Sequence, residues 1–387
     1  MSGPLQGPLA GVRVVEIAGL APAPFGCMIL ADLGADVLRI DRAGSSAAIT
    51  PPQGPLDRGR RTVAVNLKDP GGLTLVRRLV AGADVFVEGF RPGVAERIGI
   101  GPADLQAINP RLVYARMTGW GQDGPLASTA GHDINYIAVA GALEPIARRG
   151  ERPLPPSNLL GDFAGGGMLM ALGILAALHE RSTSGLGQVV DAAMVDGASL
   201  YTAFQRGMHA AGLWNEEPGT NALDGAAAFY DTYPCADGKY VAVGCVEHHF
   251  FLEMLEKLGI DPVAGEAGEL PFQLDPTGWD AWRCVIGARF LTRPRDAWVE
   301  LFGASDACVS PVLSPWEAPA HPHHVARGSF VEVAGVVQPA PAPRFSRTPA
   351  AVPVGVDADG RDVVRTLEQW GIGSAEAADL LAGGSVA

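Results

Sequence analysis

The feature that most constrains the fold is a repeated alternation of strand and helix patterns over residues 12–119. Short apolar runs read VRVVEIAG, DVLRID, TVAVNL, DVFVEGF and RLVYARMTG, and each predicts a buried strand. The segments PAPFGCMILADLGA and DPGGLTLVRRLVAGA predict helices. A chain that alternates in this way covers its strands with helices on both faces. The pattern therefore predicts an α/β fold with a doubly wound, Rossmann-like, mostly parallel sheet.

The pattern changes in the second half of the chain. Helical segments dominate residues 131–212, and AAFYDTYPCADGKYVAVGC then predicts two strands joined by an Asp237-Gly238 turn. Helices are expected again in HHFFLEMLEKLG and RDAWVELFGA, which indicates a smaller α+β domain. Two domains are the default for 387 residues, which exceed one ordinary core. We expect a large domain over 1–195, a linker helix over 196–228, a small domain over 229–318, and a linker with a C-terminal return to the large domain over 319–387.

Composition excludes several classes of protein. The net charge of −13 argues against a nucleic-acid partner. The most apolar stretch, Met168–Leu178, is too short to span a bilayer, and the N-terminus lacks the pattern of a signal peptide, so we expect no membrane partner. Five scattered cysteines without a CxxC pair favour a reducing compartment, and we expect a cytoplasmic protein. The HPHH segment at 321–324 lies among prolines without ligand-spaced acids, so no metal site is expected.

A local excess of basic residues breaks the acidic background. Residues 39–68 hold six basic side chains (Arg39, Arg42, Arg58, Arg60, Arg61 and Lys68) against Asp41 and Asp57. Such a patch suits a small phosphate-bearing ligand, although arginine is abundant throughout the chain. The segment EIAGLAPAPFG after the first strand lacks the GxGxxG fingerprint, which argues against a nicotinamide or flavin enzyme. No cofactor is expected.

Three polar residues stand where helical segments begin. His132 precedes INYIAVAGAL, Asp162 precedes FAGGGMLMALGILAAL, and Glu247 precedes HHFFLEMLEKLG. Each fits a structural role, as a helix cap or a first-turn acid that satisfies the helix dipole. Each also fits proton transfer, and the glycines around Asp162 indicate that something approaches the backbone closely. The residues alone leave both interpretations open.

Seven ordered segments together resemble the family III coenzyme A transferases, and within them the α-methylacyl-CoA racemases. The resemblance extends from near the N-terminus to about residue 330. Among its motifs are GVRVVEIAGLAPAPFGCMILADLGADVLRIDR, EGFRPGVAERIGIGP, ARMTGWGQDGPLASTAGHDINYIAVAGAL, NLLGDFAGGGMLMALGILAALHER and HPHHVARGSF. It implies a family III CoA transferase fold, acyl-CoA thioester substrates and an interlocked homodimer with active sites shared between chains. The substrate and CoA contacts that it implies are Arg42, Arg91, Arg97, Gly131, Asp133, Tyr136 and Tyr230.

The resemblance also separates two chemistries. Racemases carry a histidine at the position of His132, where transferases usually have tyrosine, so it implies a 2-methylacyl-CoA racemase that transfers protons through an enolate. His132 and Asp162 are then the acid–base pair, Glu247 supports the imidazole, and backbone N–H groups near Asp162 are expected to stabilise the enolate. The alternatives are a CoA transferase that forms an anhydride on Asp162 and a non-catalytic CoA-thioester binding protein. The sequence does not specify the acyl chain.

Overall fold

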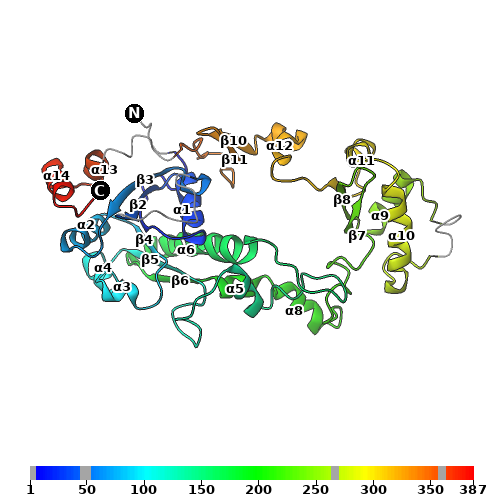
Figure 1. Cartoon of the computed structure of the whole chain (residues 1–387), viewed down its shortest axis with the longest axis horizontal. Helices are drawn as coiled ribbons and strands as arrows, with labels where there is room; N and C mark the ends of the chain where they lie inside the picture. Colours follow the sequence, from blue (N-terminus) through cyan, green and yellow to red (C-terminus); the bar gives the residue numbers. More distant parts are fainter. Residues whose placement is uncertain (1–5, 44–53, 263–269, 356–362) are drawn as a thin grey trace. The chain divides into compact units, whose positions relative to one another are not determined.

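The computed structural model describes residues 6–43, 54–262, 270–355 and 363–387. The chain divides into two compact units, which are described separately (Figure 1). Unit 1 comprises Met1–Ala140, Pro156–Tyr201 and Pro322–Ala387, and unit 2 comprises Gly141–Pro155 and Thr202–His321. Residues 141–155 and 202–228, which the sequence-based ranges assign to the large domain and the linker helix, belong to unit 2.

Unit 1 is built on a six-stranded sheet in the order β3-β2-β1-β4-β5-β6, in which every neighbouring pair is parallel. This sheet confirms the predicted α/β class. The edge strand β6 was missed by the sequence reading, which placed its residues within a helical region; it is short, and its first three residues are not buried. The strands are β1 (Arg13–Ile17), β2 (Asp36–Arg42), β3 (Arg60–Val65), β4 (Val85–Glu88), β5 (Val113–Thr118) and β6 (Val189–Ala193).

Helices cover both faces of this sheet because successive strand residues point to opposite sides. Val14 of β1 joins the core with α1 (Pro22–Asp32) and α6 (Leu169–Ser184), whereas Val15 joins the core on the other face. That second face carries α2 (Pro70–Ala81), α3 (Val94–Arg97), α4 (Pro102–Ile108), α13 (Val363–Gln369) and α14 (Ser374–Ala382). The C-terminal helices of unit 1 therefore pack on the same sheet as its first strands (Figure 1).

The remaining elements of unit 1 connect and extend this framework. A hairpin formed by β10 (Phe330–Val333) and β11 (Val336–Pro339) follows α12 (Pro322–Arg327), and η1 (Pro55–Asp57) precedes β3. Three helices lie near the carboxyl edge of the sheet and carry the candidate site. They are α5 (Asp133–Val139), the wide π-type helix η2 (Leu159–Met168), and α7 (Met194–Leu200).

Helices η2 and α6 are continuous and form the longest apolar helix of the described chain. Together they span Leu159–Ser184, which is long and apolar enough to cross a membrane by length and composition, at a mean hydropathy of 1.7. This helix is longer than Met168–Leu178, the segment that the sequence analysis considered too short to span a bilayer. One such helix is weak evidence for a membrane span, because the core helices of soluble proteins can be equally long and apolar. Its Met170, Ala171, Ile174 and Ala177 are buried in the core beside the sheet.

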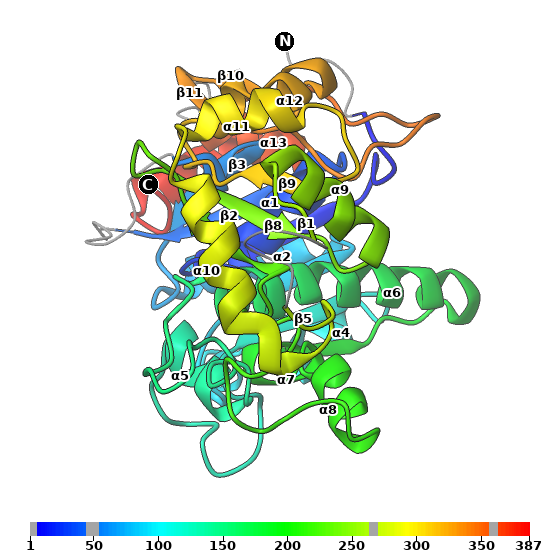
Figure 2. The same cartoon turned by 90° about the vertical axis from the view of Figure 1, so that its right-hand side faces the viewer.

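Unit 2 contains a three-stranded antiparallel sheet in the order β7-β8-β9. The predicted hairpin is confirmed: β7 (Tyr230–Pro234) and β8 (Tyr240–Gly244) pair, and Gly238 in the turn between them has a φ of 75°. Figure 2 shows α9 and α10 beside β8 of this sheet. Phe251 of α9 and Phe290 of α10 belong to the aromatic-rich core that joins the helices to the sheet. The other elements are α8 (Ala203–Ala210), α9 (His248–Leu258), η4 (Pro276–Gly278), α10 (Trp279–Phe290), α11 (Arg295–Phe302), β9 (Val309–Pro311) and η5 (Ala318–Ala320).

Candidate active site

The strand order of unit 1 locates a binding crevice. From β1 the sheet continues to β2 and β3 on one side and to β4, β5 and β6 on the other, so the strand order reverses between β1 and β4. In open α/β sheets, ligands bind at such a switch point, outside the carboxyl ends of the strands. Arg42 is the last residue of β2, and Arg91 and Arg97 follow the end of β4. All three side chains are exposed. The three predicted CoA-contacting arginines therefore follow carboxyl ends at one edge of the sheet.

Most of the basic patch counted from the sequence serves the fold. Arg58 is buried against Asp32 at 2.5 Å, and Arg60 is buried against Glu16 at 2.5 Å. Burial raises the pKa of Asp32 even though the Arg58 hydrogen bond lowers it. Two further arginines of the patch are ion-paired, Arg39 with Asp41 and Asp57, and Arg61 with Asp36. Of the arginines in this patch, only Arg42 is exposed in the described structure.

His132 occupies the N-cap position of α5, but its imidazole is not the cap. The backbone at His132 is extended, and the side chain makes no cap hydrogen bond. Instead, the Asn135 Oδ1 accepts the backbone N–H of His132 at 3.0 Å. The imidazole is exposed and remains available for chemistry.

Asp162 also fails to serve as the cap of its helix. The N-cap of η2 is Asn158, and Asp162 is the fourth residue of that helix. The Asn158 Nδ2 donates to the Asp162 Oδ2 at 3.0 Å. Burial raises the pKa of Asp162; the Asn158 hydrogen bond lowers it, the charge of Asp133 raises it, and His132 lowers it. The backbone N–H of Asp162 also donates to the carboxylate of Asp133, the residue after His132, so the two helix starts are joined.

The glycines around Asp162 have a packing explanation. A Cβ at Gly165 would lie 2.9 Å from the backbone nitrogen of Ala198 in α7. A Cβ at Gly167 would lie 2.9 Å from the Phe25 ring and 3.1 Å from the backbone nitrogen of Gly26, both in α1. The close approach inferred from these glycines is thus confirmed, but neighbouring helices make it. Helix η2 lies wedged between α1 and α7.

Asp133 changes the expected role of the helix start. Its side chain is only 5% exposed, and its Oδ2 accepts the backbone N–H groups of Gly161 at 2.6 Å and Asp162 at 2.7 Å. We expected N–H groups near Asp162 to stabilise an enolate oxygen. These two are already bonded to a carboxylate, so that expectation was wrong for them.

Tyr136 and Gly131 form a compact support beside these groups. The buried Tyr136 hydroxyl donates to the Gly131 carbonyl, and the ring meets Trp120 edge to face at 4.8 Å between centroids. A Cβ at Gly131 would lie 2.7 Å from the Tyr136 ring, so the position requires glycine. Burial raises the pKa of Tyr136, the Asp162 charge raises it further, and Arg91 lowers it. The charges of Asp162 and Arg91 thus act on Tyr136 in opposite directions.

Two predicted site residues belong to unit 2. Glu247 is the N-cap residue of α9, yet its exposed side chain makes no cap hydrogen bond. Its charge acts on Cys308, whose pKa is raised first by burial and then by Glu247. Tyr230 is the first residue of β7 and is exposed. His132, Asp162 and the three arginines belong to unit 1.

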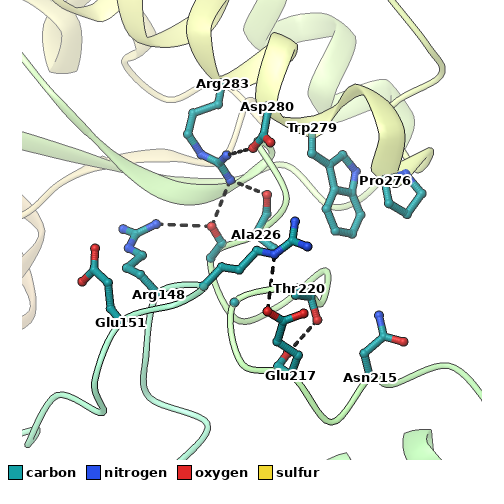
Figure 3. Close-up of a pocket in the computed structure, with 13 residues that line it drawn as sticks. Arg148, Glu151, Asn215, Glu217, Thr220, Ala226, Pro276, Trp279, Asp280 and Arg283 are labelled. Carbon is teal, nitrogen blue, oxygen red and sulfur yellow. Dashed lines mark hydrogen bonds and ion pairs between the residues drawn. The ribbon is translucent and has the colours of Figure 1, made fainter.

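A polar cavity of about 750 Å³ in unit 2 was not anticipated from the sequence (Figure 3). Its lining includes Arg148 and Arg283, both paired with Asp231 at 2.7 and 3.1 Å, and Arg149, 3.5 Å from Glu217. Arg283 also reaches Asp280 at 2.7 Å. Because carboxylates neutralise these guanidinium groups, the cavity offers little free charge to a phosphate.

The histidines of the HPHH segment do not lie in a metal-binding arrangement. His321 ends unit 2, and the other three residues begin α12. Within the described ranges, no group of three or more His, Cys, Asp or Glu side chains is placed to hold a metal ion.

Comparisons with known proteins agree with this architecture. The model of CoA-transferase family III matches residues 9–358. Alpha-methylacyl-CoA racemase from Mus musculus is 44% identical over 370 residues, 95% of this chain and 94% of that protein. The Homo sapiens protein of the same name is 44% identical over 343 residues, 88% of this chain and 87% of that protein. A crystal structure of a CaiB/BaiF family protein from Brucella suis matches 94% of this chain and 100% of that chain, with a TM-score of 0.81 at 26% identity. The chain belongs to CoA-transferase family III.

Proposed function

We propose that the protein is a racemase that interconverts (R)- and (S)-2-methylacyl-CoA thioesters. The observation that carries the proposal is that the start of the helix with Asp162 is bonded to the residue next to His132: the Asp162 backbone N–H donates to the Asp133 carboxylate at 2.7 Å. Neither side chain makes an N-cap hydrogen bond: His132 precedes α5, and Asp162 lies in the first turn of η2. Two relatives that match most of the chain are named alpha-methylacyl-CoA racemase, which supports the same reaction.

The proposed reaction needs two proton carriers on opposite faces of one carbon. Inversion next to a thioester removes a proton from one face and returns a proton to the other, with an enolate between the two steps. Histidine is the most frequent general acid–base residue, and burial raises the pKa of Asp162, which makes its carboxylate a stronger base. We assign the proton of the S substrate to His132 and that of the R substrate to Asp162. Glu247 is proposed to support the charged imidazole.

The arginines at the sheet edge are proposed to hold the CoA part of the substrate. Guanidinium groups bind phosphate through two parallel N–H donors. Arg42, Arg91 and Arg97 are exposed and follow the carboxyl ends of β2 and β4, beside the point where strand order reverses. In this arrangement the phosphates lie at the edge, and the thioester reaches toward His132 and Asp162.

We also propose an interlocked homodimer whose active sites are shared between chains. Large apolar side chains on η2 and α6 support it, since Leu159, Met168 and Leu172 are 57%, 50% and 62% exposed in the single chain. The test combines two inactive variants, His132→Ala and Glu247→Ala, by joint unfolding and refolding. Recovery of part of the activity supports a shared site. Heterodimers that form but stay inactive contradict it.

The function is tested with a chiral 2-methylacyl-CoA in D2O. A racemase exchanges the C2 hydrogen for deuterium while optical purity falls. Asp162→Asn and His132→Ala should each slow racemisation by at least about a hundredfold, the low end for general acid–base catalysis. The two variants should differ in how fast each enantiomer exchanges. Absence of label and of racemisation in the wild-type protein contradicts the proposal.

Family membership favours one second candidate, a CoA transferase that uses Asp162 as nucleophile. That reaction transfers CoA to an added carboxylic acid without labelling C2. It also leaves an acyl adduct on Asp162 that hydroxylamine traps. If this adduct is found and the substrate carries no deuterium, the transferase function is supported and the racemase function is contradicted.

A further inference from the structure

Asp133 is a buried carboxylate that the reaction as described does not use. It is 5% exposed, and no cation pairs with it in the described chain. Its Oδ2 accepts two backbone N–H groups, and its Oδ1 is buried without a hydrogen-bond partner in the described structure. A buried carboxylate is costly unless other groups compensate it. A carboxylate buried at position 133 therefore needs a local structural or functional explanation.

The bonds of Asp133 join the two proposed proton carriers. Asp133 directly follows His132 and opens α5, and one of its two bonds is to the backbone of Asp162 itself, at 2.7 Å. The other bond, at 2.6 Å, is to Gly161. A Cβ at Gly161 would lie 2.6 Å from the Asp133 Oδ2 and 2.8 Å from its Cγ, so only glycine permits this approach. One side chain thus fixes the start of η2 against the start of α5.

We propose that Asp133 is a positioning residue for the reaction, which locks the backbone of Asp162 to the helix that carries His132. The inference rests on the racemase function proposed above. Proton transfer depends on placing both groups within hydrogen-bond reach of one carbon, and a displacement of about 1 Å can cost roughly a hundredfold in rate. Helix η2 has glycine contacts with α1 and α7, but its first turn is tied to α5 through Asp133.

The charge of Asp133 adds a second effect on the same site. The groups that act on Asp162 are Asp133, which raises its pKa, and His132, which lowers it, after the larger effects of burial and of Asn158. From α5, Tyr136 also faces Asp162, and Arg91 acts on Tyr136. The α1 and α7 faces against η2 present Pro22, Phe25, Gly26, Met194, Gly197 and Ala198, which carry no charge. Removal of the Asp133 charge therefore lowers the pKa of Asp162.

The experiment compares Asp133→Asn and Asp133→Ala with a matched control. The asparagine keeps an oxygen for both N–H groups and loses the charge, whereas alanine loses both. The control is Asp69→Ala, because the Asp69 Oδ2 accepts the N–H groups of Gly71 and Gly72 at the start of α2 in the same unit. Racemisation is measured by deuterium exchange across pH, and backbone hydrogen exchange is followed in peptides that cover 159–164.

We expect Asp133→Ala to lower kcat by at least about tenfold with little change in KM, through misplacement of Asp162. Asp133→Asn should keep most of kcat at neutral pH and move the acidic limb of the pH profile to lower pH. Backbone exchange at 161–162 should accelerate in Asp133→Ala but not in Asp133→Asn. The Asp69→Ala control should lower the stability of the protein but leave the acidic limb of the pH profile at the wild-type pH.

Two results would overturn the proposal. One is a folded Asp133→Ala protein with wild-type kcat. The other is an Asp133→Asn protein whose pH profile has its acidic limb at the same pH as the wild type, together with an Asp133→Ala protein whose backbone hydrogen exchange at 161–162 is unchanged. If the wild-type protein itself exchanges no deuterium, the racemase function fails, and the backbone exchange still decides whether Asp133 holds the start of η2.

Discussion

Substitution of Gly197 by alanine tests the packing that positions Asp162. A Cβ at position 197 in α7 would lie 2.7 Å from both the Cα and the carbonyl carbon of Gly165 in η2, and closer still to the carbonyl oxygen. Ordinary van der Waals contact begins at 3.4 Å, so relief of the overlap requires about 0.7 Å of separation from the two carbon atoms (3.4 − 2.7) and about 1.4 Å from the oxygen at 2.0 Å (3.4 − 2.0). All three atoms belong to backbone, so no side-chain rotation can relieve the overlap.

The expected loss follows from two opposing terms. Overpacking of a tight core costs about 1–3 kcal/mol, and alanine gains roughly 1 kcal/mol over glycine in a helix. Gly207→Ala in α8 is the matched control, because a Cβ there meets nothing within 4 Å. The control carries only the helix gain. Gly197→Ala should therefore be less stable than Gly207→Ala by about 1–3 kcal/mol, or roughly 2–12 °C in Tm.

The assay measures urea unfolding by circular dichroism and racemisation by deuterium exchange at C2 for the same proteins. Because η2 carries Asp162, its displacement should also lower kcat, by up to roughly a hundredfold if the shift approaches 1 Å. A Gly197→Ala protein as stable as Gly207→Ala, with wild-type kcat, would refute the close crossing of α7 and η2.

Three further predictions concern charged groups. Folding raises the pKa of Asp162, so the protonated carboxyl stabilises the fold and this stabilisation is lost as pH rises. Asp162→Asn should therefore have a higher Tm than the wild type at neutral pH, and this difference in Tm should disappear below about pH 4. Arg58→Met leaves Asp32 buried without its partner and should cost about 3–5 kcal/mol in urea unfolding, with Asp32→Asn restoring part of the loss. Arg42→Ala should raise KM for acyl-CoA and weaken its dependence on salt while Tm stays unchanged, and an unchanged KM would remove Arg42 from the binding edge.

Much of the fold could be predicted from local patterns. The apolar runs that became β1, β2, β4 and β5 are buried on both faces and therefore stand out in the sequence, and the edge strand β3 buries Val63 and Val65 on one face. The hairpin of unit 2 followed from the Asp237-Gly238 turn, whose glycine adopts a positive φ. Strand β6 was missed because Val189 at its start is exposed and its neighbours give no continuous apolar run.

The candidate site was predictable in its residue types and not in its contacts. Sequence pattern and resemblance pointed to His132 and Asp162, and only the fold showed that neither is a cap. The π-type geometry of η2 carries no distinct sequence signal, since its composition equally suits an ordinary helix. The cavity lined by Arg148, Arg149 and Arg283 was missed because those arginines come from segments far apart in the chain.

The sequence by itself determined the α/β class, the parallel sheet and the membership in CoA-transferase family III, because these depend on periodicity and motifs within short segments. Tertiary structure alone decided that Arg58 and Arg60 serve buried ion pairs while Arg42 stays exposed. It also decided that the N–H groups of Gly161 and Asp162 bind Asp133, 28 and 29 positions earlier in the chain. Partners so distant are set by the packing of helices and strands, since a hydrogen bond depends on where two groups meet in space and not on their separation in sequence.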